Sequence, residues 1–534
     1  MKKHILTIWA LLLCCNALFS QGQLDAYNYA KSDLIGTARY MSMGGAFGAL
    51  GGDISVMSAN PAGLGVYRSS EIAGTLSVNS VQASTSGWDQ SINSRNTNFK
   101  MNNFGAVFYF PTASSSGVIG WNLGISYHHL KDFNRTYKAL GRGGNHSISD
   151  YMAERANRAG YHRDDLEWTN SYDPYSNREI SDWLTILAYN AVLIDAPKDP
   201  YSYHSAFGDY DAGKDSWADY QLNQRELVIR ESGAIDQYNF AFGMNVSNFL
   251  FLGADLAITN IDYNLHSFYR EDFEQNNYLD LENNLRTEAR GYQFNAGVIL
   301  RPVDFLRFGV AYNSPTWFSK MSDVYSATAN SDTYYWSEPV TASAPNSEYP
   351  GVFDYKLHSH DKWIFSAAAI IGQTALLSVD YELANYQRMK LYYTDGIANQ
   401  ATNDEISNNF TSASTLRVGA EVKITPQFAI RAGAAIAATP IKLGLQNGST
   451  EVFTVGTIPH YATGGDVTNY TAGLGYRFSP NFYLDLACVL TSQKENVYAF
   501  SNLYNNAGGI LVESHPINLK TESTRIAVTL GYKF

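Results

Sequence analysis

The sequence predicts an all-β fold, an antiparallel transmembrane β-barrel of fourteen strands that encloses an N-terminal plug. Composition is the first indication, because charged residues make up 16% of the 534 residues, against about 25% in ordinary soluble chains, while aromatic residues reach 14%. The second is that no run of about 18 apolar residues follows the N-terminal segment, which excludes a bundle of membrane helices. The third is a recurrent period-two alternation. With 45% hydrophobic residues the chain can supply a packed core, so disorder is excluded as well.

The first 22 residues have the pattern of a secretory signal peptide. Lys2 and Lys3 precede an apolar stretch, residues 5–19, that is too short to cross a membrane comfortably as a helix. We therefore expect cleavage after Ser20 or Gly22 and export of the mature chain. Cys14 and Cys15 raise a lipoprotein alternative, but neither follows a small residue, which disfavours lipidation.

The exported chain is acidic and has no internal disulfide to stabilise it. Cys488 is the one cysteine outside the signal segment. Without Lys2 and Lys3 the 38 basic residues fall to 36, against 50 acidic ones, a formal charge of −14. This balance disfavours nucleic acid or an anionic lipid surface as the main partner.

Downstream of residue 70, large apolar residues alternate with small or polar ones. Residues 119–127, 236–247 and 466–480 show the pattern clearly, and we expect their apolar faces to meet lipid. The predicted strands are 71–81, 101–110, 117–131, 236–247, 250–263, 288–301, 304–315, 361–372, 374–390, 412–425, 427–438, 466–480, 482–497 and 520–534.

Short and long connections alternate along these segments, as they do in outer-membrane barrels with tight periplasmic turns and long outer loops. The short ones are residues 111–116, 247–249, 302–303, 373, 426 and 480–481. Aromatic residues bracket them and predict a ring at the periplasmic interface: Phe110, Phe251, Phe305, Phe428, Phe478 and Phe482. The last strand alternates to a terminal Phe534, a pattern similar to the signal read by the outer-membrane insertion machinery, and outer-membrane lipids are expected around the barrel.

The second outer connection, about residues 132–235, is too long to lack structure. Ile180, Trp183, Leu184, Leu187 and Ala191 share one face of a predicted helix that begins near Ser176 or Asn177. Two interpretations stay open. The segment is a cap that stabilises the barrel mouth, or its apolar stripe forms part of a groove that collects a greasy ligand.

Residues 23–69 lack alternation and are dense in glycine. No Gly-Lys-Ser/Thr follows the cluster, so a phosphate loop is excluded. Small residues allow tight packing in a narrow space, and Asn60-Pro61 fixes a turn. The segment is therefore predicted to be a compact hatch inside the barrel, which comprises residues 70–534.

The segment GGAFGALGGDISVMSANPAGLG, followed by the first strand, resembles the FadL/TodX (OmpP1) family of outer-membrane transporters. The strand count and Phe534 agree with this resemblance. It implies a Gram-negative outer-membrane protein that admits long-chain fatty acids or aromatic hydrocarbons passively. Ligand would be captured among the outer loops, pass the hatch when it rearranges, and leave sideways through a gap at a kinked strand. The family also includes members that serve protein secretion or surface-protein attachment, so a protein partner bound by the outer loops is the alternative. We expect a monomer.

Carried onto this chain, the resemblance makes Asn60, Pro61, Ala62 and Gly63 the hatch motif, and Gly120 or Gly124 the strand kink of a lateral gate. Glycine in a strand can mark a bend, but these glycines can equally make room in the lumen.

Charged residues of both signs fall on the inward phase of the strands, where most are expected to pair with each other or with the hatch. They are Asp255, Arg307, Asp380, Glu382, Arg417, Glu421, Lys423, Arg431, Arg477, Asp485, Arg525 and Lys533. A guanidinium offers paired donors to a carboxylate. Arg307, Arg417 and Arg431 are therefore candidate partners for the carboxylate of a fatty acid.

Motifs for covalent chemistry are missing from the sequence. It contains no Gly-x-Ser-x-Gly, His-Glu-x-x-His or Cys-x-x-Cys, so we expect no enzyme, no cofactor and no metal. His358 and His360 are interpreted as a solvated pair. The run Asp209–Asp215 lacks the glycine and glutamate of an EF-hand loop, which leaves a looser surface calcium site as an alternative.

Overall fold

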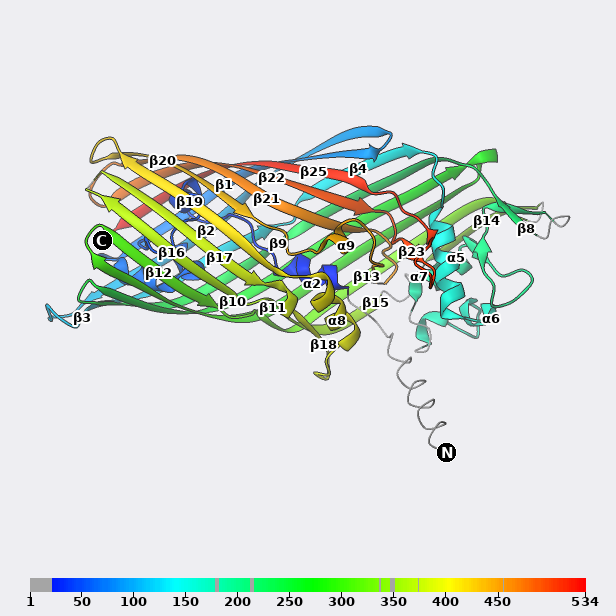
Figure 1. The fold of residues 1–534 in the computed structure, drawn as a ribbon, viewed down its shortest axis with the longest axis horizontal. Coiled ribbons are helices and arrows are strands. Elements are labelled where there is room, and N and C mark those ends of the chain that lie inside the picture. The colour runs from blue at the N-terminus through cyan, green and yellow to red at the C-terminus, as the bar shows by residue number, and fades with distance from the viewer. Residues whose placement is uncertain are drawn as a thin grey trace, which may run out of the picture.

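The computed structural model describes residues 22–177, 182–211, 216–335, 338–345, 351–372, 374–454 and 456–534. Its main feature is a closed antiparallel barrel (Figure 1). The last strand pairs with the first, from Glu71 opposite Lys533 to Ser86 opposite Asn518, and this pairing closes the barrel. Residues 1–21 of the predicted signal segment, with Cys14 and Cys15, lie outside the described residues. The turn predicted at Gln373 lies outside them as well.

Fourteen strand positions make up the described wall, and each coincides with a predicted segment. Four of them consist of two consecutive strands that continue one another along the same neighbours. The positions are β1 Glu71–Trp88, β2 Gln90–Pro111, β3 Val118–Asp132 with β4 Arg135–Arg142, β9 Leu222–Val246, β10 Leu250–Phe273, β11 Tyr278–Val303, β12 Leu306–Asn313 with β13 Trp317–Tyr335, β15 Gly351–His358 with β16 Lys362–Ile371, β17 Ala375–Asn385 with β18 Lys390–Tyr393, β19 Ser412–Lys423, β20 Phe428–Ala437, β21 Tyr461–Arg477, β22 Phe482–Tyr498 and β25 Ile517–Lys533.

Many strands run farther outward than predicted. β10 and β11 have 24 and 26 residues, whereas about 9–11 suffice to cross a bilayer. The extra length was missed because outward residues beyond the lipid band are polar, as in the exposed Arg286–Glu288 pair, so the apolar alternation ends there. For the same reason, residues that were predicted to form a loop after residue 81 instead continue β1 and β2 as paired strands, which end in a hairpin at Trp88 and Gln90.

The predicted phase of the wall is confirmed. Tyr238, Phe240 and Phe242 are exposed on the outer face, while Asn239 between them is buried. One aromatic prediction is wrong: Phe251 is 1% exposed and faces inward, packed on Ala62 and Ile299 rather than on the interface with lipid headgroups.

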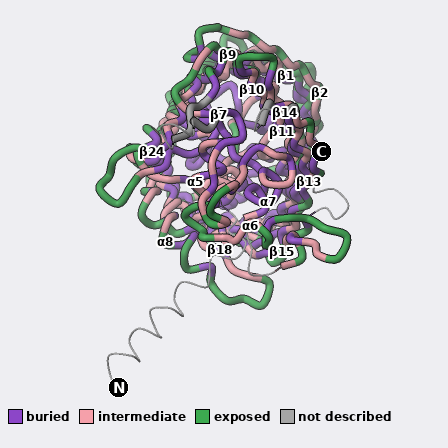
Figure 2. Tube along the Cα trace, turned by 90° about the vertical axis from the view of Figure 1, so that its right-hand side faces the viewer, coloured by how far each residue is buried: buried purple, intermediate pink, exposed green. Residues whose placement is uncertain are grey.

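Short elements close the outer end of the barrel (Figure 2). Because β4 and β9 extend into the long connection, its non-barrel part spans residues 143–221. The predicted helix is present as α7, but it begins at Trp183 with Asp182 as its N-cap, while Ser176 ends a separate 3-10 turn. Ile180 lies outside the described residues. The outer elements are α5 Ile148–Ala159, α6 Arg163–Leu166, η2 Pro174–Ser176, α7 Trp183–Asn190, β5 Ile194–Asp195, β6 His204–Ser205, β7 Gly208–Asp211, β8 Ser216–Asp219, η3 Glu274–Asn276, β14 Glu338–Pro345, η4 Tyr386–Arg388, α8 Gln400–Asn409, α9 Leu443–Gln446, β23 Leu503–Tyr504 and β24 Ile510–Val512.

The largest apolar core lies under this cap. It joins α5 and α7 to the inner faces of the outer strand ends, with Tyr151, Trp183, Phe207 and Phe273 among its largest members. Within the described residues, no helix has the length and apolar character needed to span a bilayer.

The hatch, residues 22–69, lies inside the barrel (Figure 1). It contains α2 Gln23–Ala30, α3 Ala38–Ser42, α4 Val56–Ala59 and η1 Pro61–Val66. Four small apolar clusters join it to inward-facing wall residues, including Val107, Ala368, Ala527 and Ile299. The candidate site is built where the hatch meets this wall.

Candidate functional site in the barrel lumen

The hatch motif lies across a row of three glycines in the wall. Gly253 on β10 is directly opposite Gly243 on β9 and Gly297 on β11. A Cβ on Gly253 would lie 2.2 Å from the Ala62 nitrogen, and one on Gly297 would overlap the Asn60 side chain. The backbone of η1 therefore sits where side chains of the wall would otherwise be.

Asn60 holds the turn of the motif in place. Its Oδ1 accepts a hydrogen bond from the Ala62 N–H at 3.1 Å, and its Nδ2 donates to the Gly48 carbonyl at 2.6 Å. Pro61 occupies the first position of η1, where its missing N–H costs nothing. Gly52 N–H donates to the Gly63 carbonyl at 3.0 Å and links the motif to the glycine-rich loop before it.

The two glycines considered as a strand kink have different surroundings. A Cβ on Gly124 would meet the Met57 and Leu64 side chains of the hatch, whereas one on Gly120 would meet the Tyr109 ring. Gly124 is paired on both sides, with Val107 on β2 and Ala241 on β9. Its immediate structural role is to make room for the hatch.

The pairing between β2 and β3 stops at Asn103 opposite His128. Farther outward, β2 pairs with β1, and among the described residues no main-chain pair joins it to β3 or β4. Side chains bridge this seam, with Asn98 Nδ2 donating to Asp132 Oδ2 at 2.7 Å. Phe99 and Met101 are exposed at this level, which places the seam beside lipid.

On another side of the lumen an ion-pair chain fixes the hatch to the wall. Arg39 on α3 pairs with Glu421 on β19 at 2.9 Å, and Glu421 also pairs with Arg431 on β20 at 2.6 Å. Arg431 in turn reaches Asp485 on β22 at 2.5 Å. The pKa of the Arg39 guanidinium is raised, because the Glu421 carboxylate more than offsets the opposing effect of burial.

Protein groups already engage the three arginines predicted to meet a ligand carboxylate. Arg431 belongs to the chain just described. Arg417 pairs with Glu382 at 3.1 Å, and Arg307 donates to the Leu50 carbonyl of the hatch at 2.5 Å. The structure thus places all three in the lumen, where they stabilise the wall or the hatch.

A cavity of about 320 Å³ lies on the outer side of the hatch. Concave sites of about 300–1,000 Å³ are the usual size for small-molecule ligands. Aromatic side chains of α2 and β3–β4 line part of it, namely Tyr27, Tyr29 and Phe133, while Arg417 and Arg525 reach it from the wall.

Lys31 at the end of α2 is the distinctive cation of this cavity. Its Nζ lies 4.6 Å from the centre of the Tyr27 ring, and no carboxylate in the described part of the chain is within ion-pair distance. Its pKa is lowered to about 7, mainly by burial and then by the nearby Lys131 and Arg135, whose effect outweighs the opposing effect of Glu495 and Glu231. An anionic group entering the cavity would therefore be stabilised next to Lys31.

Several lumenal residues were missed from the sequence. Arg135 binds both Glu231 and Glu495 across the cavity wall. Both Arg135 and Glu231 were assigned to the outer loop, because the apolar alternation ends at residue 131 and resumes only at residue 236. Lys31 carried no sequence signal, since the hatch has no periodic pattern.

The structure gives no support to a histidine metal pair. The His358 ring packs on Tyr392, and the His360 ring packs on Tyr386 at 4.0 Å between centres. In the part of the chain that is described, no three histidine, cysteine or carboxylate side chains gather to hold a metal. Residues 212–215 of the considered calcium loop lie outside that part.

Comparisons with known proteins agree with this architecture. The family model described as outer membrane protein transport protein (OMPP1/FadL/TodX) matches residues 248–534. The toluene transporter TodX of P. putida is 11% identical, with 94% of this chain and 99% of that one covered and a TM-score of 0.51. A Pseudomonas aeruginosa FadL homologue is 12% identical, with 95% and 100% covered and a TM-score of 0.51. At these identities the likeness establishes a shared fold. No protein with a curated description matches the chain.

Proposed function

Because the chain belongs to the OMPP1/FadL/TodX family of outer membrane transport proteins, we propose that it admits hydrophobic small molecules across the outer membrane through a lumen gated by the hatch. The cargo classes are long-chain fatty acids and aromatic hydrocarbons. The observation that carries the proposal is the cavity against the hatch, which combines aromatic side chains with Lys31, a cation without a carboxylate partner among the described residues.

Lys31 favours a cargo with an anionic end. The rings of Tyr27, Tyr29 and Phe133 offer apolar surface to a hydrocarbon, while a carboxylate would offset the mutual repulsion of Lys31, Lys131 and Arg135. A plain aromatic hydrocarbon would gain from the rings alone. We therefore rank a fatty acid above an aromatic hydrocarbon.

The seam between β2 and β3 is the place we propose for a sideways exit. An opening at Gly124 would require main-chain pairs to break on one side of β3, whereas beyond Asn103 and His128 the two strands are held by side chains. Phe99 and Met101 would then receive the cargo on the lipid side.

The test is uptake in a deletion strain complemented with the wild type or with Lys31→Met, using radiolabelled oleate and radiolabelled toluene. We expect deletion to abolish uptake of a hydrophobic probe, and Lys31→Met to reduce oleate uptake severalfold while toluene uptake stays unchanged. Lys31→Arg, which keeps the charge, is the matched control.

Uptake of both probes that survives deletion would refute the transport proposal. If deletion instead removed a protein from the cell surface, the outer loops would be serving secretion or surface-protein attachment. Equal loss of oleate and toluene uptake in Lys31→Met would refute the role of Lys31 and leave transport itself intact.

A further inference from the structure

Helix α3 separates two cavities that follow one another along the same strands. On β19, Arg417 lines the outer cavity, and Glu421 lines a second cavity of about 180 Å³ on the periplasmic side. On β25, Arg525 likewise lines the outer cavity and Thr529 the inner one. Four residues of a strand span about 13 Å. Tyr40 faces the outer cavity and its neighbour Arg39 faces the inner one, so α3 lies between the two cavities.

A few specific contacts hold α3 against the wall. The Ala38 N–H donates to Thr529 Oγ1 at 2.7 Å, and Thr471 Oγ1 donates to the Ser42 carbonyl at 2.9 Å. Arg39 adds its ion pair with Glu421. The apolar contacts of Ala38 and Met41 are with Ala487 and Val489 from β22 and with Ala527 from β25.

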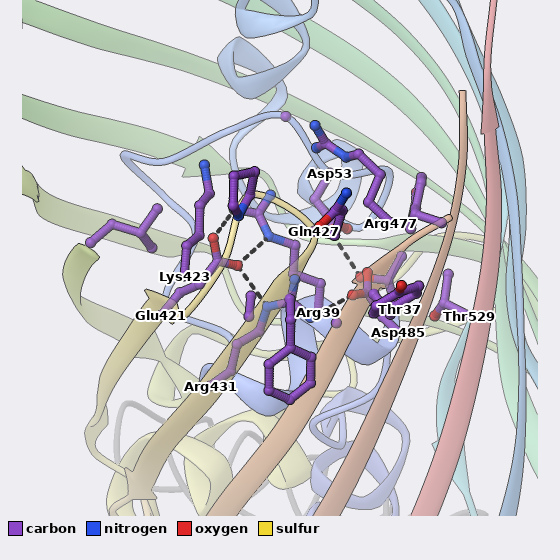
Figure 3. Close-up of a pocket in the computed structure, with 18 of the residues that line it drawn as sticks. Thr37, Arg39, Asp53, Glu421, Lys423, Gln427, Arg431, Arg477, Asp485 and Thr529 are labelled. Carbon is purple, nitrogen blue, oxygen red and sulfur yellow. Dashed lines mark hydrogen bonds and ion pairs between the residues drawn. The ribbon is translucent and has the colours of Figure 1, made fainter. Parts of the chain in front are cut away.

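The inner cavity has a charged lining (Figure 3). Carboxylates and cations both line it, and Arg39, Glu421 and Asp485 are among the labelled side chains. Its charged members are Arg39, Asp53, Glu71, Glu421, Lys423, Arg431, Arg477, Asp485 and Lys533. Such a wall suits hydrated ions and small polar solutes, and it would repel a hydrocarbon that must give up apolar contacts to enter.

We propose that α3 is a door for small polar solutes and that the Arg39–Glu421 pair is its latch. When the pair opens, α3 moves and the two cavities become one aqueous route along β19–β25. Glycines flank the helix on both sides, Gly36 before it and Gly44 and Gly45 after it, the latter two at φ +63° and +76°. This function goes beyond the proposed uptake of hydrophobic molecules, because both the cargo and the route differ.

Planar-bilayer conductance in potassium chloride tests the latch. Removing one charge-assisted pair multiplies the open population about tenfold. Arg39→Gln should therefore raise the mean conductance by about that factor. Arg68→Gln is the matched control: it also removes a hatch arginine that contacts the wall, at Asn248, but Arg68 is not among the residues lining either cavity.

A reversible cross-link tests the door without removing the latch. Cysteines at positions 38 and 529, in a chain with Cys488→Ser, lie close enough for a disulfide, since the Ala38 nitrogen already contacts the Thr529 side chain. Oxidation should abolish the conductance of both the otherwise wild-type chain and Arg39→Gln, and reduction should restore it.

Equal conductance of Arg39→Gln and Arg68→Gln would overturn the proposal, and so would conductance that persists in the oxidised cross-linked chain. Should Arg39→Gln fail to fold, the oxidised and reduced forms of the cross-linked chain still decide the matter. Hydrophobic uptake is a separate readout, because failure of oleate and toluene uptake would leave the conductance result unaffected.

Discussion

Replacing Gly253 by alanine should unseat the hatch motif. The added Cβ would lie 2.2 Å from both the Ala62 nitrogen and the Pro61 carbonyl carbon, more than 1 Å short of the roughly 3.5 Å at which carbon atoms pack. Both neighbours are backbone atoms, so no rotamer change relieves the overlap. Overpacking of this kind costs about 1–3 kcal/mol, which corresponds to a population shift of about fivefold to more than a hundredfold.

Two measurements would register the shift. In planar bilayers, Gly253→Ala should conduct more than the wild type, because η1 no longer rests on the glycine row. In urea unfolding followed by tryptophan fluorescence, its midpoint should fall. The matched control is Gly74→Ala on β1, where the added Cβ would meet the Phe104 ring at 3.2 Å and come no nearer than 3.9 Å to a backbone atom, the Asn103 carbonyl oxygen. If Gly253→Ala behaved like Gly74→Ala in both assays, the close seating of the motif would be refuted.

Three further outcomes are expected. Asn60→Ala removes the bond to the Ala62 N–H and leaves the Gly48 carbonyl without its donor, which should lower the free energy of unfolding by about 1–3 kcal/mol in urea titrations. Arg431→Met leaves the Asp485 carboxylate without its ion-pair partner and should cost about 3–5 kcal/mol in the same titration, whereas Arg68→Gln should cost little. Lys31 should make oleate binding pH-dependent: with a pKa of about 7, it loses its charge as the pH rises through that value, so affinity should fall above pH 7 in the wild type but not in Lys31→Met. The unfolded state binds the Lys31 proton up to about pH 10.5, so the stability that Lys31→Met gains over the wild type should be largest below pH 7 and should vanish towards pH 10.5.

The sequence was most informative where one face of a strand meets lipid. Tyr238, Phe240 and Phe242 could be assigned to the outside because the contrast with Asn239 is strong at every second position. Beyond the lipid band the outward face becomes polar and the apolar residues of β10 and β11 face inward to the core under the cap, so the apolar-outward pattern used to recognise the strands ends there. The inward orientation of Phe251 was missed for a related reason, because an aromatic residue next to a turn suits either the membrane interface or the hatch.

The candidate site was predictable in its parts but not in its contacts. Asn60 and Pro61 could be singled out by turn chemistry, and the inward charges could be found by phase. That Gly253 faces Ala62, or that Arg39 meets Glu421, depends on how residues far apart in the sequence are brought together, which no local pattern specifies. Lys31 illustrates the same limit, since its lowered pKa comes first from burial in the lumen and then from Lys131 on another element.

The hatch also completes the wall that surrounds it. Asp380 accepts a hydrogen bond from the Gly48 N–H at 2.8 Å, and Arg307 donates to the Leu50 carbonyl. Without the hatch these buried groups would lose their partners, at a cost of about 1–3 kcal/mol or more each. Departure of the whole hatch would therefore cost more than a movement of α3 alone, because it would also break these contacts of the Gly48–Leu50 loop. The glycine row under η1 and the groups that hold the Gly48–Leu50 loop therefore fix this part of the hatch to the wall, which agrees with the proposal that α3, on the charged side, is the part that moves.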